Sequence, residues 1–151
     1  MITYCNNNFL KITSDVEPCL TVQVPLEIYG KEEQEIIKEK PFLNKRHILF
    51  NFYYGAEQYC LLFNKGYRWD GATIPPGVRW IIGPPSHPAF LLASMVHDKL
   101  CENHYLIDND RYLSSLIFKE LLIASDVSSF KANIMFYAVD NFQKFFGGWK
   151  E

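Results

Sequence analysis

Residues 88–103, PAFLLASMVHDKLCEN, mark the point at which the periodicity of the sequence changes. The apolar residues of this segment recur at helical spacing: Phe90, Leu91, Met95 and Val96. Ser86 can cap a helix here, and Pro88 is tolerated in its first turn because the N–H groups of that turn have no partner within the helix. We therefore predict that a helical region begins near residue 86.

Two further helices are predicted downstream. The second begins at about Asp110, within the capping cluster Asp108–Asp110, and carries a broad apolar stripe made of Leu113, Leu116, Ile117, Phe118, Leu121 and Leu122. The third begins near Ser128 or Ser129 and ends at Gly147 and Gly148, since glycine favours helix ends.

Upstream of residue 70 the pattern favours strands. Residues 20–24 and much of 47–54 alternate between apolar and polar side chains, and residues 59–63 form a short apolar run. Between the last two segments, residues 54–57 read as a hairpin connection because Gly55 can take the positive φ that a tight turn needs. These segments predict an antiparallel sheet.

The polar run KEEQEIIKEK (residues 31–40) fits either a short helix or an exposed strand pair with its loop, and in both cases a solvated surface. Together the patterns predict an α+β fold, with an N-terminal antiparallel β-sheet region followed by three α-helices. We expect a single domain over residues 1–151, with mainly strands in residues 1–70 and the three helices in residues 86–147.

Composition excludes several classes of function. The net charge of −2 provides no general attraction to nucleic acid, and no apolar run reaches the length of a transmembrane segment. The N-terminus shows no signal peptide, so a cytosolic protein is expected. The four cysteines, Cys5, Cys19, Cys60 and Cys101, are widely spaced and form no CxxC pair, which predicts thiols rather than disulfides or a structural zinc site.

The adjacent residues His97 and Asp98 are the first candidates for chemistry. Successive helix positions point about 100° apart, so the two side chains serve neighbouring places rather than one. An imidazole can act as a base near neutral pH, and the carboxylate can bind a metal ion or a neighbouring loop. The alternative is a core histidine bonded to a backbone carbonyl beside an ordinary surface acid.

The segment GYRWDGATIPP (residues 66–76) is the second candidate. Its Asp-Gly turn and its two prolines hold Asp70 and Thr73 on a stiff loop just before the helices. A carboxylate on a rigid loop is suited to orient an imidazole, which predicts a hydrogen bond between Asp70 and His97. The alternative is that Asp70 caps its own turn.

The order of these motifs resembles the phage-associated domain-of-unknown-function family 1353 over roughly residues 45–145. The positions that match its pattern are Asp70, Gly71, Ile74, Pro75, His97, Asp98, Arg111 and Phe118, with Thr73 where serine is usual. Two positions depart from it: Cys101 stands where tyrosine is usual, and Ser115 where the second helix would carry aspartate. The resemblance implies a phage or prophage origin rather than a particular reaction.

The paired helices are also similar, more distantly, to those of phospholipase A2 enzymes. That similarity implies a histidine that activates water, an adjacent aspartate that binds calcium and a second-helix aspartate that steadies the imidazole. This chain has Ser115 at the last of these positions and lacks an evident glycine-rich calcium loop. Both departures argue against an active phospholipase.

Two functions therefore remain open. In the first, the protein binds a virion or host partner, and a buried hydrogen-bond network of Asp70, His97 and Asp98 fixes the helix to the loop. Thr73, Arg111 and Ser115 support this site. In the second it is a hydrolase in which His97 is the general base, Asp70 orients it and Asp98 holds a divalent cation. For both functions we expect the protein in the host cytoplasm, and the alternative location is the virion. Aromatic residues recur along and just beyond the last helix: Phe136, Tyr137, Phe142, Phe145, Phe146 and Trp149. Such a stripe is expected mainly to pack in the core and at the C-terminus, and the alternative is a partner surface at its far end.

Overall fold

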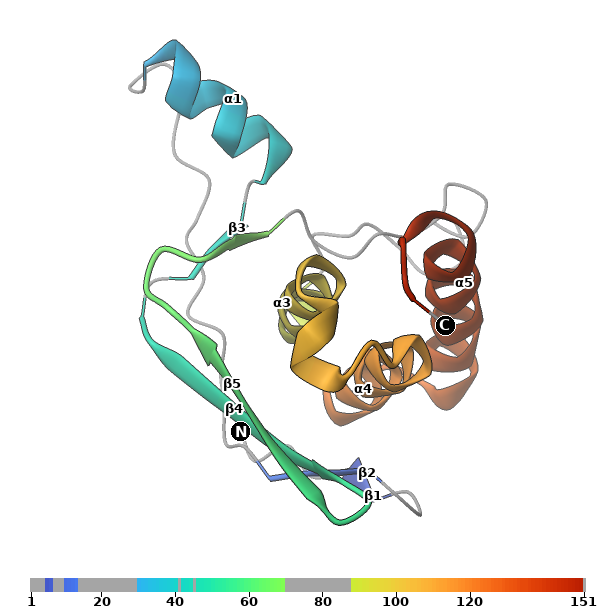
Figure 1. Ribbon diagram of the computed structural model, residues 1–151. Coiled ribbons are helices and arrows are strands. Elements are labelled where there is room, and N and C mark those ends of the chain that lie inside the picture. The colour runs from blue at the N-terminus through green and yellow to red at the C-terminus, as the bar shows by residue number, and fades with distance from the viewer. Residues whose placement is uncertain are drawn as a thin grey trace.

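The computed structural model describes residues 5–6, 10–13, 30–40, 42–44, 46–69 and 88–150. Strands in the N-terminal half precede helices in the C-terminal half, so the predicted α+β class is confirmed (Figure 1). The strand expected at residues 20–24 and the cap expected at Ser86 lie outside the described residues.

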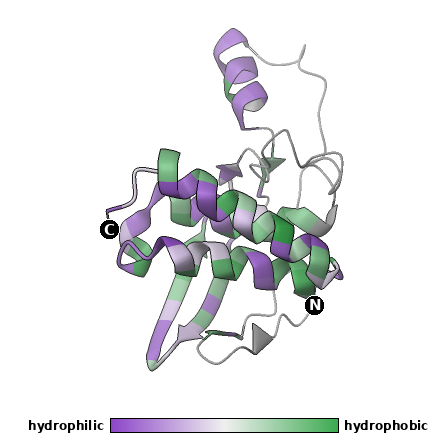
Figure 2. Ribbon diagram, turned by 90° about the vertical axis from the view of Figure 1, so that its right-hand side faces the viewer, coloured by the Kyte–Doolittle hydropathy of each residue, from purple (hydrophilic) through white to green (hydrophobic). Residues whose placement is uncertain are grey.

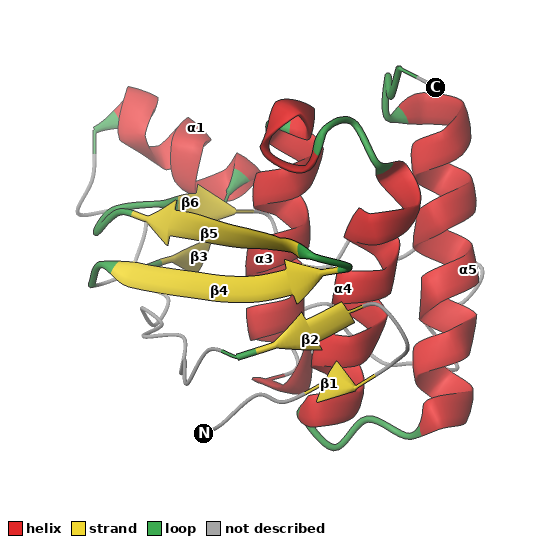
Figure 3. Cartoon of the chain, turned by 60° about the horizontal axis from the view of Figure 1, so that its bottom comes forward, coloured by secondary structure: helices red, strands yellow, loops and turns green. Residues whose placement is uncertain are grey.

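Within these ranges, four strands form an antiparallel sheet in the order β1-β2-β4-β5. The strands are β1 (Cys5–Asn6), β2 (Leu10–Ile12), β4 (Ile48–Tyr54) and β5 (Glu57–Phe63). In β4, Ile48, Phe50 and Phe52 are buried whereas Leu49 and Tyr53 are exposed, as the alternation predicted. The sheet thus presents one apolar face to the helices, which lie behind it in Figure 3.

The hairpin between β4 and β5 is confirmed as well. Tyr54 pairs with Glu57, so only Gly55 and Ala56 form the loop. Gly55 has a φ of 62°, whereas Ala56 does not have a positive φ. A positive φ at the first loop residue alone is characteristic of a type II′ turn, whose twist suits antiparallel strands and which favours glycine there.

A two-stranded ribbon joins β3 (Phe42–Leu43) to β6 (Arg68–Trp69). It carries the chain from the sheet toward the helices, and its last residue, Trp69, is fully buried.

The three predicted helices are α3 (Pro88–Glu102), α4 (Arg111–Ala124) and α5 (Ser129–Phe146). The predicted cap at Asp110 is present, because Asp110 Oδ1 accepts from the Leu113 N–H at 3.0 Å. Ser128, near which the third helix was expected to begin, also acts as a cap, since its Oγ accepts from the Lys131 N–H at 3.3 Å. A short 3₁₀ helix that the sequence did not reveal, η3 (His104–Ile107), connects α3 to α4. None of the helices in the described ranges has both the length and the apolar character needed to cross a bilayer.

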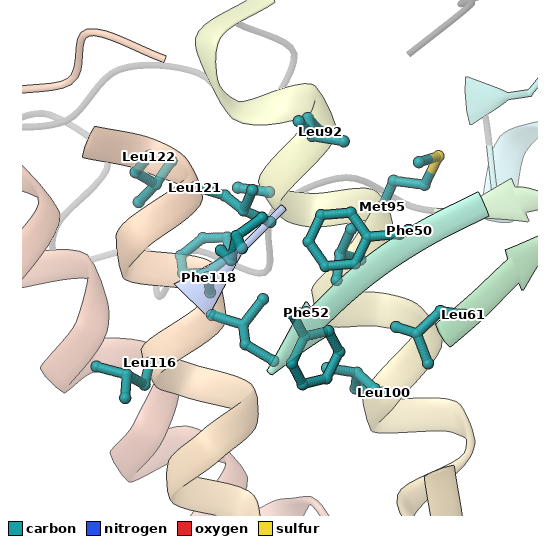
Figure 4. Packing of buried hydrophobic residues seen from close by; sticks show 14 of the residues in the cluster. Phe50, Phe52, Leu61, Leu92, Met95, Leu100, Leu116, Phe118, Leu121 and Leu122 are labelled. Carbon is teal, nitrogen blue, oxygen red and sulfur yellow. The ribbon is translucent and has the colours of Figure 1, made fainter. Parts of the chain in front are cut away.

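The core lies between the sheet and the first two of these helices. Figure 4 shows side chains of the sheet meeting those of α3 and α4: Phe50, Phe52 and Leu61 on one side, and Met95, Leu100 and Phe118 on the other. Each of these side chains is almost completely buried. In contrast, α5 packs on the outer side of α4, away from the sheet (Figure 1).

The polar run of residues 31–40 forms a helix, α1 (Lys31–Glu39), rather than a strand pair. It adds a helix to the N-terminal half that the three-helix prediction did not include. Its surface is mostly hydrophilic, and it stands apart from the helical layer (Figure 2). The expectation of a solvated segment is therefore confirmed.

The end of α5 depends on a glycine. A Cβ atom at Gly147 would lie within 3.0 Å of atoms of Gln143 and Trp149, so a larger residue cannot be accommodated without movement. The chain then folds back, and the Trp149 ring stacks on His104 with centroids 3.7 Å apart while its Nε1–H donates to Gln143 Oε1 at 3.0 Å. The last turn of α5 is thereby tied to η3.

Tyr59 of β5 contacts the segment between η3 and α4. Its hydroxyl donates weakly to Glu57 Oε2 at 3.3 Å and to Asp108 Oδ2 at 3.4 Å. Burial, followed by the negative charges of Glu57 and Asp108, raises the pKa of Tyr59 from its ordinary value of 10.0 to about 12.

This shift predicts a loss of stability at alkaline pH. Because the folded protein keeps the phenol protonated, the stabilisation is complete below pH 10 and is lost as the pH rises toward 12. We expect the free energy of unfolding to fall more steeply between about pH 9 and about pH 11.5 in the natural protein than in Tyr59→Phe, as measured by urea denaturation. Equal slopes in the two proteins would show that the pKa of Tyr59 is not raised in the folded state. Some slope remains in the variant, since burial also raises the pKa of Tyr54.

Candidate functional site

His97 lies in the most deeply buried stretch of α3. Every side chain from Phe90 to Asp98 is buried, because the sheet covers one side of α3 and α4 covers another. His97 itself is 2% exposed, and its ring meets Phe118 of α4 with centroids 5.0 Å apart and planes tilted by 47°. The histidine is therefore a core residue with very little access to solvent.

The thiol of Cys101 lies one helical turn beyond His97. Its Sγ is 3.7 Å from His97 Nδ1 and 3.6 Å from Nε2. A sulfur at nearly the same distance from both nitrogens does not lie along the lone pair of either, so this is a packing contact rather than a directed thiol–imidazole hydrogen bond. Neither Cys60 nor Cys101 is part of a disulfide, as their spacing predicted.

Asp98 is 8% exposed and is therefore not an ordinary surface acid. Such deeply buried carboxylates are costly unless they are paired or hydrogen-bonded, and neither Asp98 nor His97 is without a partner. In the described ranges, no three His, Cys, Asp or Glu side chains come together in a way that could hold a metal ion. A cation at Asp98 therefore stays a prediction.

Trp69 connects the second candidate segment to α3. Its indole Nε1–H donates to Ser94 Oγ at 3.0 Å, and the Ser94 hydroxyl donates to the Leu91 carbonyl at 3.0 Å. Both Trp69 and Ser94 are fully buried. Ser94 lies one helical turn before His97, so the ribbon that ends at Trp69 is fixed to α3 beside the candidate histidine.

Asp70 and Thr73 follow Trp69 in the chain but lie outside the described residues. The hydrogen bond expected between Asp70 and His97 stays a prediction.

Arg111 and Ser115 of α4 both contact Asp140 of α5. Arg111 Nε is 3.2 Å from Asp140 Oδ1, and the Ser115 hydroxyl donates to the same oxygen at 2.8 Å. The ion pair is largely withdrawn from solvent, with 13% of the Arg111 side chain and 18% of the Asp140 side chain exposed. Two of the expected supporting residues thus belong to one cluster, which joins α4 to α5.

The sequence interpretation missed Asp140. The signal was present, because Asp140 directly follows Val139 on the stripe of α5 that packs against α4. An acid at the border of a buried helix face needs a partner, and Arg111 is the cation that the next helix supplies. A carboxylate therefore lies beside Ser115, but it belongs to Asp140 of α5 and is bound to Arg111.

Two curated relatives, both from Sinorhizobium fredii (strain NBRC 101917 / NGR234), are similar to about half of the chain. One, the uncharacterized protein y4iH, is 32% identical over 76 residues, which are 50% of this chain and 30% of that protein. The other, the uncharacterized protein y4jT, is 38% identical over 74 residues, which are 49% of this chain and 21% of that protein. The similarity thus spans less than a third of either relative. No solved structure matches the chain.

A family model also matches residues 47–139, which run from β4 through α4 into α5. This match includes His97, Asp98, Arg111 and Ser115 and covers well over half of the chain. The chain belongs to the family described as "Protein of unknown function (DUF1353)".

Proposed function

We propose that this protein is phage- or prophage-encoded and acts by binding a virion or host protein, while the His97–Asp98 pair belongs to its structural framework. The observation that carries this proposal is a set of aromatic side chains exposed on α5. The resemblance of its motifs to a phage-associated family supports the origin and a place in the host cytoplasm or in the virion.

The exposed set, called here the α5 aromatic face, consists of Phe130, Tyr137, Phe142, Phe145 and Phe146. Phe130, Phe145 and Phe146 are each more than 70% exposed, and Tyr137 is 64% exposed. Large exposed apolar patches on soluble proteins often mark interaction sites. In protein interfaces, buried aromatic side chains commonly contribute much of the binding energy. Tyr112 of α4 extends this surface, since its ring meets Phe136 beside Tyr137.

The surroundings of His97 support a structural role. A general base for hydrolysis must reach a water molecule and a substrate, but His97 is 2% exposed and packed against Phe118. The hydroxyl of Ser115 donates to Asp140, so it is engaged with α5. The hydrolase is therefore the less favoured alternative.

Crosslinking tests whether the α5 aromatic face binds a protein. A photo-reactive phenylalanine analogue placed at Phe145 should give a discrete crosslinked product in phage-producing cells, identified by mass spectrometry. The matched control places the same analogue at Leu49, which is 56% exposed on the outer face of the sheet, and should give none. Crosslinking from Leu49 but not from Phe145 would contradict the proposed surface.

Substitutions separate the two functions. With the purified partner, Phe145→Ala and Tyr137→Ala should each raise Kd about tenfold, as expected when an anchor residue of an interface is truncated. His97→Asn should bind within about twofold of the natural protein, because no partner reaches a buried ring. The hydrolase would be favoured instead if the natural protein cleaved a phospholipid or short-chain ester and His97→Asn did not. Stabilisation by calcium that disappears in Asp98→Asn would support it further.

A further inference from the structure

The exposed charges within α5 itself are all positive. Lys131 follows Phe130 and is exposed, and Lys144 Nζ lies 5.9 Å from the centroid of the Phe145 ring. The acid within α5, Asp140, is paired with Arg111 and mostly buried. This face therefore suits an apolar partner that carries negative charge.

The chain itself contains a helix with the complementary character. On α1, Ile36 is 52% exposed. Glu32, Glu33 and Glu39 lie four residues before, three residues before and three residues after it, so they flank it on the same side of the helix. The lysines, Lys31 and Lys38, lie on the opposite side, where Lys38 pairs with Glu35 at 3.7 Å.

The environment of α1 is unusual for so short a helix. It has nine residues and no side-chain N-cap, and its side chains are mostly exposed. Helices shorter than about 12 residues are marginal in water unless a packed face stabilises them. Its C-terminal end is nevertheless held in place, because Lys40 Nζ lies 3.1 Å from Glu102 Oε1 and the Lys40 carbonyl accepts from Arg68 Nη1 at 3.3 Å. The helix is thus presented in a defined direction, with Ile36 exposed.

We propose that α1 of one copy of this chain docks on the α5 aromatic face of a second copy. The inference rests on the proposed function, because it takes the same face as a protein-binding surface and names its occupant. Figures 1 and 3 place α1 and α5 on opposite sides of the molecule, so a chain cannot cover its own α5 with its own α1. The contact is therefore head-to-tail, and repetition produces a ring or a filament.

Charge favours this pairing over a symmetric one. An antiparallel α5 pair that matched Phe130 with the partner's Phe145 would also bring Lys131 next to the partner's Lys144, and like charges would repel. In the α1 pairing, the acidic side of α1 instead lies between Lys131 and Lys144. The face between Phe130 and Phe145 extends over roughly 22 Å, enough for the nine residues of α1 to lie along it. Such a small contact is expected to be weak, so assembly requires high concentration.

Reciprocal charge reversal tests the proposal. One variant carries Glu32→Lys and Glu39→Lys, and the other carries Lys131→Glu and Lys144→Glu. In each variant one reversal lies near a helix start and the other near a helix end, so the effects on the helix dipole roughly cancel. A third variant, with Lys11→Glu and Lys65→Glu, changes the net charge by the same amount as the second, and both exposed positions lie outside α1 and α5.

Sedimentation equilibrium from about 10 µM to about 1 mM should show the mass of the natural protein rising above 17.6 kDa, and less so at high salt. Each of the first two variants should stay monomeric, and an equimolar mixture of them should associate again. The third variant should associate like the natural protein. A natural protein that stays monomeric throughout, or first and second variants that fail to associate when mixed, would overturn the inference.

The remaining outcomes distinguish other occupants. If the monomer binds anionic phosphatidylglycerol vesicles and loses this binding with Lys131→Glu and Lys144→Glu, then the face is a lipid-binding surface and the inference is wrong. If self-association fails but crosslinking from Phe145 finds a virion or host protein, the inference is wrong and the proposed function stands. If neither Phe145 crosslinking nor self-association occurs, both are wrong.

Discussion

Trp69→Ala should lower the free energy of unfolding by about 3–5 kcal/mol, as expected when a large aromatic side chain is removed from a core. Trp69 is fully buried. Its ring stacks against Phe42 and Tyr67, with centroids 5.7 Å and 6.0 Å away. Its N–H also donates to Ser94, so the substitution removes both packing and a buried hydrogen bond. Urea denaturation followed by circular dichroism measures the loss.

Two controls separate packing from hydrogen bonding. Trp69→Phe keeps a buried ring and should cost less than the alanine variant. Ser94→Ala leaves the indole N–H of Trp69 without its acceptor in a dry site, which should cost about 1–3 kcal/mol. If Trp69→Ala cost no more than Ser94→Ala, the ring would not pack as described.

Asp140→Ala should have the second-largest effect, a loss of about 2–3 kcal/mol. Removing the carboxylate leaves the guanidinium of Arg111 and the hydroxyl of Ser115 without a shared acceptor in a site that is mostly closed to solvent. The value is below that of a fully buried pair, because both side chains retain some contact with water. Urea denaturation of the variant tests the prediction directly.

An exposed ion pair supplies the matched control. Glu35 and Lys38 of α1 are 3.7 Å apart and mostly exposed, so Glu35→Ala should change stability by less than about 1 kcal/mol. Ser115→Ala, which removes one of the two donors to Asp140, should fall between the two variants. Similar effects of Asp140→Ala and Glu35→Ala would show that the α4–α5 cluster adds no stability.

The sequence was most informative where one physical requirement acts along a short stretch of chain. Residues 48–54 read as a strand because one face of β4 must be apolar, and Asp110 reads as a helix cap because free N–H groups need acceptors nearby. Residues 31–40 remained ambiguous, because two adjacent isoleucines among charged residues show neither the 3.6-residue period of a helix nor the two-residue period of a strand. Strand β2 and helix η3 are too short to show any period.

The site was harder to predict because its contacts join distant residues. His97 stood out as a polar residue in an apolar helix, and the structure shows that it is indeed buried. The partner of Ser115, however, is 25 residues away on another helix. Which residues of α5 face α4 depends on how the helices cross, and no local pattern encodes that. Similarly, the bond from Trp69 to Ser94 depends on where the ribbon meets α3.

The pairing of β2 with β4 has a consequence for how the chain folds. Ile12 pairs with Phe52, 40 residues further along, whereas β4 and β5 are joined by two residues and α3, α4 and α5 pack in sequential order. Closing a long loop costs more entropy than closing a short one, and such pairings slow folding. The hairpin and the helices can therefore form first, with β2 joining the sheet late. A destabilising change in β2, such as Leu10→Ala, should then mainly accelerate unfolding and leave the folding rate nearly unchanged.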